Sequence, residues 1–97
     1  MRIIALGTLK EFWKKRPDSK EPLKAWYAVS HAADWKSPQE VKKAYGNASI
    51  LLDGRVVFNI AGNKYRLVAW INYPYRVLYI RFIGTHAEYD KIDAQTV

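Results

Sequence analysis

The feature that most constrains the fold is a change of hydrophobic period at Gly46. Before this glycine, apolar residues recur at the spacing of amphipathic helices. After it, the run from Ser49 to Ile83 alternates apolar and polar residues as β-strands do, with turn signals at Asp53-Gly54, Gly62-Asn63 and Tyr73-Pro74. Because strands joined by tight turns pair with one another, this half predicts an antiparallel meander.

Four strands are expected in the meander, over residues 48–52, 55–60, 65–72 and 76–83. An opening strand is expected at the N-terminus, over residues 2–6. With helices in the first half, the prediction is an α+β domain. It has a four- to five-stranded, mainly antiparallel sheet, N-terminal helices on one face and a short C-terminal helix. A chain of 97 residues is the size of one such domain, so residues 1–97 are expected to form a single one.

The boundaries of the first two helices are predicted from proline and capping signals. Thr8 and Glu11 have the spacing of a capping box, in which the hydroxyl and the carboxylate satisfy free amides at a helix start. This helix is expected to end before Pro17, since the residue preceding a proline rarely stays helical. The second helix is expected to begin within residues 19–22 and to run to about Ala33.

The same signals predict two shorter helices. Ser37 and Glu40 repeat the capping pattern, with a proline at the first helical position, and Gly46 is expected as the left-handed residue after the helix end. Thr85 and Glu88 predict a capped C-terminal helix directly after the glycine at which the last strand is expected to stop.

Alternation divides the strand residues between two faces of the sheet. The first set is almost purely apolar and is expected to lie under the helices: Val56, Phe58, Ile60, Tyr65, Leu67, Ala69, Ile71, Leu78, Ile80 and Phe82. The second set is partly apolar and partly cationic and is expected to be uncovered: Val57, Asn59, Arg66, Val68, Trp70, Asn72, Val77, Tyr79, Arg81 and Ile83. Arg66 and Arg81 are therefore expected on an open face and not in the core.

The charge of the chain points to a polyanion as partner. Sixteen Lys and Arg against nine Asp and Glu give a formal net charge of +7. Residues 41–84 hold Lys42, Lys43, Arg55, Lys64, Arg66, Arg76 and Arg81 against a single acid, Asp53. Cations on an aromatic-rich domain favour nucleic acid, because each neutralised phosphate releases condensed counterions. A general gain in solubility is the alternative reading of the same charge.

Several classes of chemistry are excluded or disfavoured. The chain has no cysteine, which excludes disulfides, thiolate ligands and cysteine nucleophiles, and it has only two histidines, so neither a metal site nor a cofactor is expected. No apolar run approaches the roughly 20 residues of a membrane-spanning helix. The N-terminus lacks the pattern of a secretory signal, so cytoplasmic residence without a membrane partner is expected.

Four residues form the candidate catalytic set: Arg66, Arg81, His86 and Tyr89. Two guanidinium groups can hold phosphate oxygens in bidentate fashion and stabilise the charge of a pentavalent state. A histidine titrates near neutrality and can move a proton, and a tyrosine can stack on a base or support that transfer. RNA would supply its own nucleophile, the 2′-hydroxyl. Taken singly, each residue also has a plain structural reading, as a cap, a packing residue or a solvated cation.

Six further residues are candidate RNA contacts: Asn63, Lys64, Lys42, Lys43, Trp70 and Tyr79. Exposed aromatics beside arginines suit base stacking, but they suit a protein partner equally well. Asn63 is also explained as a turn residue. Lys42 and Lys43 on the third helix are also explained as a solvated face, whose charge could still attract RNA at long range.

The segments FNIAGNKYRLVA (58–69) and YIRFIGTHAEYD (79–90) resemble the HigB-type toxins of bacterial toxin–antitoxin pairs, within the RelE superfamily. The resemblance implies an mRNA interferase that acts in the ribosomal A site without a metal and leaves a 2′,3′-cyclic phosphate and a 5′-hydroxyl. It implies inhibition by a cognate HigA-type helix-turn-helix antitoxin. It also implies that Arg66 and Arg81 contact phosphate and that His86 and Tyr89 lie in the acid–base and stacking region.

The resemblance leaves the general base open, because Lys64 is the only lysine inside a motif whereas the best-known RelE-type enzymes use several. Two alternative functions also remain. One is a non-catalytic RNA- or ribosome-binding protein that uses the same basic sheet face. The other is a protein-interaction module whose aromatic face receives a partner.

Overall fold

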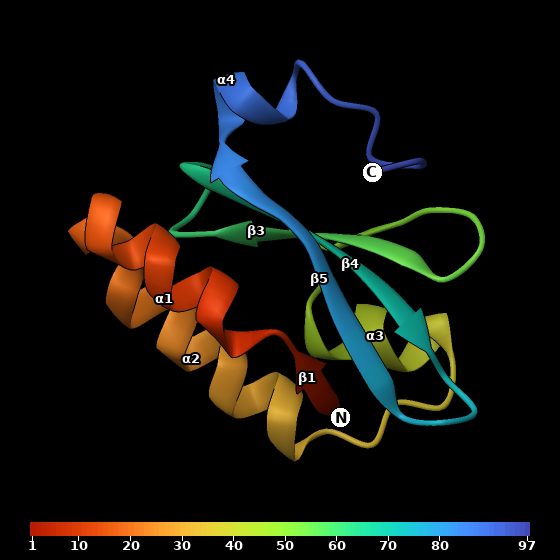
Figure 1. The fold of residues 1–97 in the computed structure, drawn as a ribbon. Coiled ribbons are helices and arrows are strands. Elements are labelled where there is room, and N and C mark those ends of the chain that lie inside the picture. Colours follow the sequence, from red (N-terminus) through yellow and green to blue (C-terminus); the bar gives the residue numbers. More distant parts are fainter.

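A computed structural model describes all residues from 1 to 97 and shows an α+β arrangement, as the sequence predicts (Figure 1). In chain order, the elements are β1 (Arg2–Ile4), α1 (Leu6–Lys15), a 3-10 turn (Pro17–Ser19), α2 (Lys20–Ala32), α3 (Pro38–Ala44), β2 (Ser49–Ile50), β3 (Arg55–Ile60), β4 (Tyr65–Asn72), β5 (Val77–Thr85) and α4 (His86–Tyr89). None of the helices has the length and apolar character that spanning a membrane requires.

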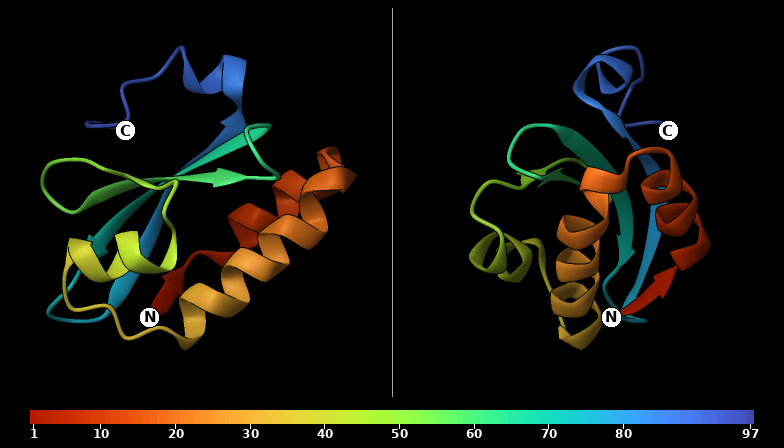
Figure 2. Two further views of the ribbon diagram at one scale, coloured as in Figure 1. Left: turned by 180° about the vertical axis from the view of Figure 1, so that it is seen from behind. Right: turned by 90° about the vertical axis from the view of Figure 1, so that its left-hand side faces the viewer.

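The strands form one sheet in the order β1-β5-β4-β3-β2. The meander from β2 to β5 is antiparallel throughout, whereas β1 pairs with β5 in parallel. Parallel pairing is possible here because α1 to α3 and the meander separate the two strands in the chain. Helices α1 and α2 run side by side, and α4 lies at the end of the molecule opposite to the N-terminus (Figure 2).

The main core lies between the first sheet face and helices α1 to α3. Leu9, Leu23, Trp26 and Val41 from the helices pack with buried strand residues. Eight of the ten residues predicted for this face are buried: Val56, Phe58, Ile60, Tyr65, Leu67, Ala69, Ile71 and Leu78. Ile80 is half-buried against the same core. The alternation of β3 and β4 therefore predicted their inner face correctly.

A β-bulge at Arg81 overturns the prediction for the end of β5. Ala69 pairs with Ile80 but Val68 pairs with Phe82, so Arg81 is the extra residue in β5. An extra residue reverses the alternation that follows it. Phe82, predicted for the helix-covered face, therefore lies on the second face, and Ile83, predicted for the second face, packs against the main core.

Some helix boundaries also differ from the predictions. Helix α1 begins at Leu6 with Ala5 as N-cap, because the chain turns from β1 directly into the helix; the Thr8 amide already bonds to the Ala5 carbonyl oxygen (3.1 Å). Thr8 is therefore not a cap. The predicted helix end before Pro17 is confirmed.

The cap predicted for α3 is formed only in part. Ser37 is the N-cap, with Pro38 at the start of α3, but the Glu40 carboxylate accepts from the Lys36 amide (3.0 Å) instead of closing a capping box. The helix ends through Tyr45, whose amide bonds to the Val41 carbonyl oxygen (2.9 Å). Gly46, predicted to be left-handed, does not have a positive φ; Gly54 and Gly62 do.

Two predictions for the region after Gly46 need correction at their ends. The strand predicted over 48–52 is reduced to Ser49–Ile50, and β5 does not stop at Gly84 but continues to Thr85. The capping box of α4 is confirmed: the Thr85 hydroxyl accepts from the Glu88 amide (3.2 Å), and the Glu88 carboxylate accepts from the Thr85 amide (2.7 Å). The hydrogen bond from the Thr85 amide, and after it the one from the Thr85 hydroxyl, hold the pKa of the Glu88 carboxyl below its usual range.

Candidate nucleic-acid interface

The second face of the sheet is partly covered, contrary to the prediction of an open face. The C-terminal segment, residues 90–97, folds back over β3 and β4, and Ala94 packs on Val57 and Val68, which are buried. The Gln95 side chain fixes this segment to the β2–β3 turn. Its amide nitrogen donates to the Leu52 carbonyl oxygen (2.8 Å), and its amide oxygen accepts from the Leu52 amide (3.0 Å).

Three arginines remain on this side of the sheet, and we call the surface that they form the arginine face: Arg55 on β3, Arg66 on β4 and Arg81 on β5. The apolar patch of Val57, Val68 and Phe82 supports the strands between them. The arginine face lies on the other side of the sheet from the main core, so its cations do not need burial partners. The predicted placement of Arg66 and Arg81 outside the core is confirmed.

Arg66 and Tyr89 are brought together. The Arg66 guanidinium carbon lies 6.0 Å from the centroid of the Tyr89 ring, within the range of a cation–π contact, and its Nη1 donates to the Asn63 carbonyl oxygen (3.3 Å). Arg66 pairs with Gly84 across the sheet, immediately before α4 begins. The capped start of α4 therefore positions the tyrosine over the arginine.

His86 occupies the first position of α4 and is exposed. Its Nδ1 lies 3.4 Å from a carboxylate oxygen of Asp90, one helical turn later. A carboxylate at this distance orients the imidazole ring. The structure shows an ion-pair contact of His86 with Asp90, and no hydrogen bond or cation–π contact between His86 and Arg66 or Arg81.

Arg81 meets a residue that the sequence analysis did not include among the site residues, Arg55. The Arg81 Nε donates to the main-chain oxygen of Val97 (3.4 Å), and the Arg55 Nη1 donates to the same oxygen. Two guanidinium groups thus hold one oxygen atom, as an anionic oxygen would be held. Arg55 has the same parity as Val57 on β3, so the alternation that predicted the second face could have identified it.

Two of the candidate RNA-contacting lysines, Lys64 and Lys42, have structural partners of their own. Lys64 forms an ion pair with Asp18, at the connection between α1 and α2. The Lys42 Nζ donates to the Ala48 carbonyl oxygen (2.6 Å), and Lys43 is exposed on α3. Neither lysine of α3 contacts the arginine face.

Trp70 and Tyr79 pack against each other, whereas the sequence predicted them as exposed aromatic side chains. Their ring centroids are 5.3 Å apart at an interplanar angle of 31°. The Trp70 Nε1 donates to the Asp53 carbonyl oxygen (2.7 Å), which fixes the ring at the β2–β3 turn. Both side chains are half-buried, so part of the pair remains accessible to solvent.

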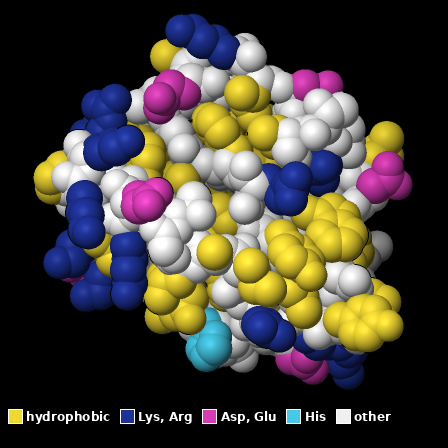
Figure 3. Space-filling model, viewed as in Figure 1, with side chains coloured by type: hydrophobic (Ala, Val, Ile, Leu, Met, Phe, Trp, Pro, Cys, Tyr) yellow, Lys and Arg dark blue, Asp and Glu magenta, His cyan; other side chains and the backbone are white.

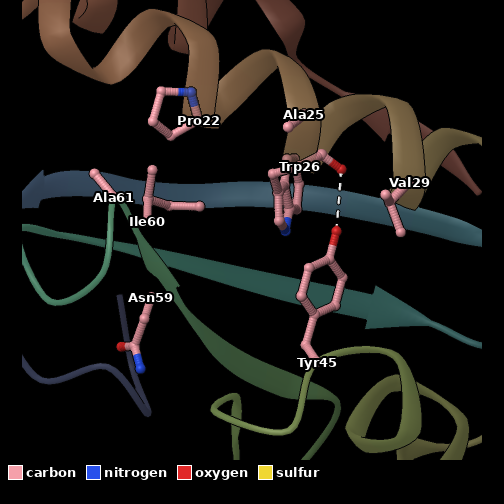
Figure 4. Close-up of a pocket in the computed structure, with 8 residues that line it drawn as sticks. All are labelled: Pro22, Ala25, Trp26, Val29, Tyr45, Asn59, Ile60 and Ala61. Atoms are coloured by element: carbon pink, nitrogen blue, oxygen red, sulfur yellow. Dashed lines mark hydrogen bonds between the residues drawn. The ribbon is translucent and has the colours of Figure 1, made fainter.

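A pocket of about 200 Å³ lies between α2 and the edge of β3, away from these residues (Figure 4). Six of its eight lining residues are apolar, and the Tyr45 hydroxyl closes one side by donating to the Trp26 carbonyl oxygen (3.3 Å). It contains none of the predicted catalytic residues. No group of three His, Asp or Glu side chains is placed to hold a metal ion.

Comparison with known proteins gives a consistent result. Residues 19–92 match the family described as HigB_toxin, the RelE-like toxic component of a toxin–antitoxin system. Among curated proteins, the chain is 30% identical over 94 residues to an mRNA interferase HigB of Escherichia coli O6:H1, a match that covers 95% of this chain and 91% of the relative. It is 33% identical over 92 residues to the mRNA interferase toxin HigB of Escherichia coli strain K12 and to an mRNA interferase HigB of Shigella flexneri, with 93% of this chain and 88% of each relative covered.

Proposed function

Because the chain belongs to the HigB family of RelE-like toxins, we propose that it is an endoribonuclease that cuts messenger RNA and so inhibits translation and growth. The observation that carries this proposal is similarity over 93–95% of the chain to relatives named mRNA interferase. The arginine face, with Tyr89 over Arg66 and His86 at the start of the neighbouring helix α4, supports the same function, because these are the types of group that phosphodiester cleavage needs.

The proposed reaction uses the 2′-hydroxyl of the RNA as nucleophile. Its oxygen attacks the adjacent phosphorus, a new P–O2′ bond forms and the bond to the 5′-oxygen of the next nucleotide breaks. The products are a 2′,3′-cyclic phosphate and a 5′-hydroxyl. One proton passes from the 2′-oxygen to a general base, and one is delivered to the departing 5′-oxygen by a general acid or by water, so the step balances without a metal ion.

We assign the proton transfer to His86, since an imidazole changes protonation near neutral pH and Asp90 orients it. Arg66 and Arg81 are assigned to the phosphate oxygens, where they stabilise the charge of the transition state. Arg55 joins them, because it already shares an oxygen with Arg81. Tyr89 supports Arg66 and offers a ring edge for a base.

The C-terminal segment must move for this arrangement to work. In the structure, the main-chain oxygen of Val97 occupies the position between the Arg55 and Arg81 guanidinium groups. A phosphate that binds both groups displaces that oxygen and takes over its hydrogen bonds. Both arginines then keep an oxygen acceptor, so the exchange of the Val97 oxygen for a phosphate oxygen has a small net free-energy cost in hydrogen bonds.

We further propose that the message is cut during translation in the ribosomal A site, and that a HigA-type helix-turn-helix antitoxin holds the toxin inactive. The first test is induction of the protein in a bacterial cell, followed by primer extension on a translated message. New 5′ ends inside the reading frame are expected, and they should disappear when the start codon of that message is removed.

The Arg81→Ala variant is the second arm of this test. It is expected to lower cleavage by about 10²–10³-fold, the usual effect of removing one transition-state hydrogen-bond donor. Binding to ribosomes should fall much less, because a transition-state contact affects turnover most. Normal cleavage by Arg81→Ala would contradict the assigned role. Ribosome binding by the wild-type protein without any cleavage would favour the non-catalytic alternative.

A further inference from the structure

A groove of about 300 Å³ lies between α1 and α2, away from the arginine face. Each helix contributes one stripe of residues spaced by four and then three positions, so that each stripe covers about two turns on one side of its helix. The lining residues are Leu6, Lys10 and Trp13 on α1 and Lys20, Lys24 and Tyr27 on α2.

The groove has an apolar floor and a cationic rim. Leu6, Trp13 and Tyr27 are half-buried and pack against the main core, which fixes the floor in place. Lys10, Lys20 and Lys24 are exposed. A rigid apolar channel bordered by flexible ammonium groups is complementary to a segment that presents apolar residues on one side and carboxylates beside them.

None of the three lysines has an acidic partner within the chain. The three ion pairs of the structure involve Lys64, Arg76 and His86. The segment 6–32 also carries Lys14, Lys15 and Arg16, so it holds six basic residues against three acids, Glu11, Asp18 and Glu21. Figure 3 shows Lys and Arg side chains gathered on the left-hand side of the molecule, over α1 and α2. The charge of the groove is thus left for a partner to neutralise.

We propose that this groove is the docking site of an acidic amphipathic helix of the antitoxin. The proposal rests on the function given above, since the partner of a toxin in such a pair is its antitoxin. An apolar residue of that helix packs on Leu6, Trp13 and Tyr27, and its acidic residues pair with the rim lysines. Two parallel stripes at helical spacing are the shape into which a third helix packs.

A helix fits the groove better than a strand of RNA does. Stacking of bases requires free aromatic faces, but Tyr27 already stacks on His31, with the ring centroids 5.4 Å apart and the planes 8° from parallel. The groove also offers only lysines and no arginine fork for bidentate phosphate contacts. Because α1 and α2 cover the first sheet face, a helix in the groove leaves the arginine face free.

The test uses the double variant Lys10→Glu/Lys24→Glu and, as a matched control, Lys14→Glu/Lys36→Glu, which makes the same charge change at exposed lysines outside the groove. The probe is the purified product of the neighbouring gene whose co-expression relieves growth arrest. Its dissociation constant is measured by isothermal titration calorimetry at low and high salt. Cleavage of a translated message and the thermal midpoint of each variant are measured separately.

The groove variant is expected to bind the antitoxin about tenfold or more weakly than the wild type, with a smaller salt dependence. The control variant should bind as the wild type does, and cleavage and thermal midpoint should be unchanged in both. The proposal would be overturned if the groove variant bound the antitoxin with wild-type affinity. It would also be overturned if the groove variant bound the antitoxin normally but lost binding to ribosomes or to a short single-stranded RNA. Antitoxin binding and RNA cleavage are measured in separate assays. A protein without nuclease activity can therefore be distinguished from a protein whose groove does not bind the antitoxin.

Discussion

At the scale of single residues, Arg81 has an effect beyond its own charge. It is the extra residue of the β5 bulge, and the reversal that follows places Phe82 under the C-terminal segment and Ile83 against the helices. A bulge also redirects the side chain at the bulged position. Arg81 thereby meets Arg55 at one oxygen atom, an arrangement that brings together residues from β3 and β5, which are separated by β4.

The histidine assignment is tested at this scale. His86→Ala is expected to lower the single-turnover rate of cleavage on programmed ribosomes by about 10²–10⁴-fold, the usual contribution of general acid–base catalysis. The pH dependence of the remaining rate near neutrality should flatten, which loss of a merely structural residue would not cause. His31→Ala is the control, because His31 stacks on Tyr27 in α2. A His86→Ala protein that cleaves at the wild-type rate would remove His86 from the mechanism.

At the scale of elements, the turns of the meander determine how the strands reach the site. The β2–β3 turn contains Gly54, whose φ is +82°. A Cβ at this position would lie 2.6 Å from the Ile71 carbonyl oxygen on β4. Only glycine combines this φ with such a close approach of two strands. The same turn anchors Trp70 through the Asp53 carbonyl oxygen and Gln95 through Leu52, so it links the sheet to the C-terminal segment.

Gly54→Ala is therefore expected to lower the free energy of unfolding by about 1–3 kcal/mol, the cost of a strained backbone position with a main-chain clash. Urea denaturation followed by tryptophan fluorescence would measure it. Gly46→Ala is the matched control, since a Cβ at Gly46 would have no atom within 4 Å and the φ there is not positive, so its effect should stay within about 0.5 kcal/mol. Equal stability of the two variants would show that the turn tolerates a side chain.

At the scale of the whole molecule, Asp18 joins the helical half of the chain to the sheet. It lies in the connection between α1 and α2, forms an ion pair with Lys64 and accepts a hydrogen bond from the Tyr65 hydroxyl (2.5 Å). These contacts span 46 and 47 residues of sequence. The hydrogen bonds from Lys64 and Tyr65 lower the pKa of the Asp18 carboxyl. The same hydrogen bonds raise the pKa of the Lys64 ammonium group and of the Tyr65 hydroxyl.

This link predicts a defined dependence of stability on pH. Because the folded state lowers the pKa of Asp18, its contribution is complete above the unfolded value, about 3.9, and is lost as the pH falls through the lower folded value. Asp18→Asn should therefore have a lower thermal midpoint than the wild type at neutral pH, and the difference should shrink below about pH 4. Circular dichroism melts from neutral pH to about pH 3 would measure it. A difference that stays constant over this range would contradict the link.

Much of the fold could be predicted from the sequence because it depends on local chemistry. The turns at Gly54 and Gly62, the alternation of β3 and β4 and the capping box of α4 each follow from residues only a few positions apart. The placement of Arg66 and Arg81 outside the core followed from the same alternation. The helix start at Leu6 and the shortened β2 were not predicted, because packing between elements overrides capping and period signals.

Local patterns were enough to predict the order of the elements, the inner face of β3 and β4 and the family of the chain, because hydrophobic period, turn residues and motif spacing depend only on residues close together in the sequence. Three features required the folded structure: residues 90–97 cover part of the second face, a bulge at Arg81 exchanges the faces of Phe82 and Ile83, and Arg55 meets Arg81. Each of these depends on which distant segments pack together. Contacts over 16 and 42 residues of sequence are selected by burial and geometry that no local pattern records.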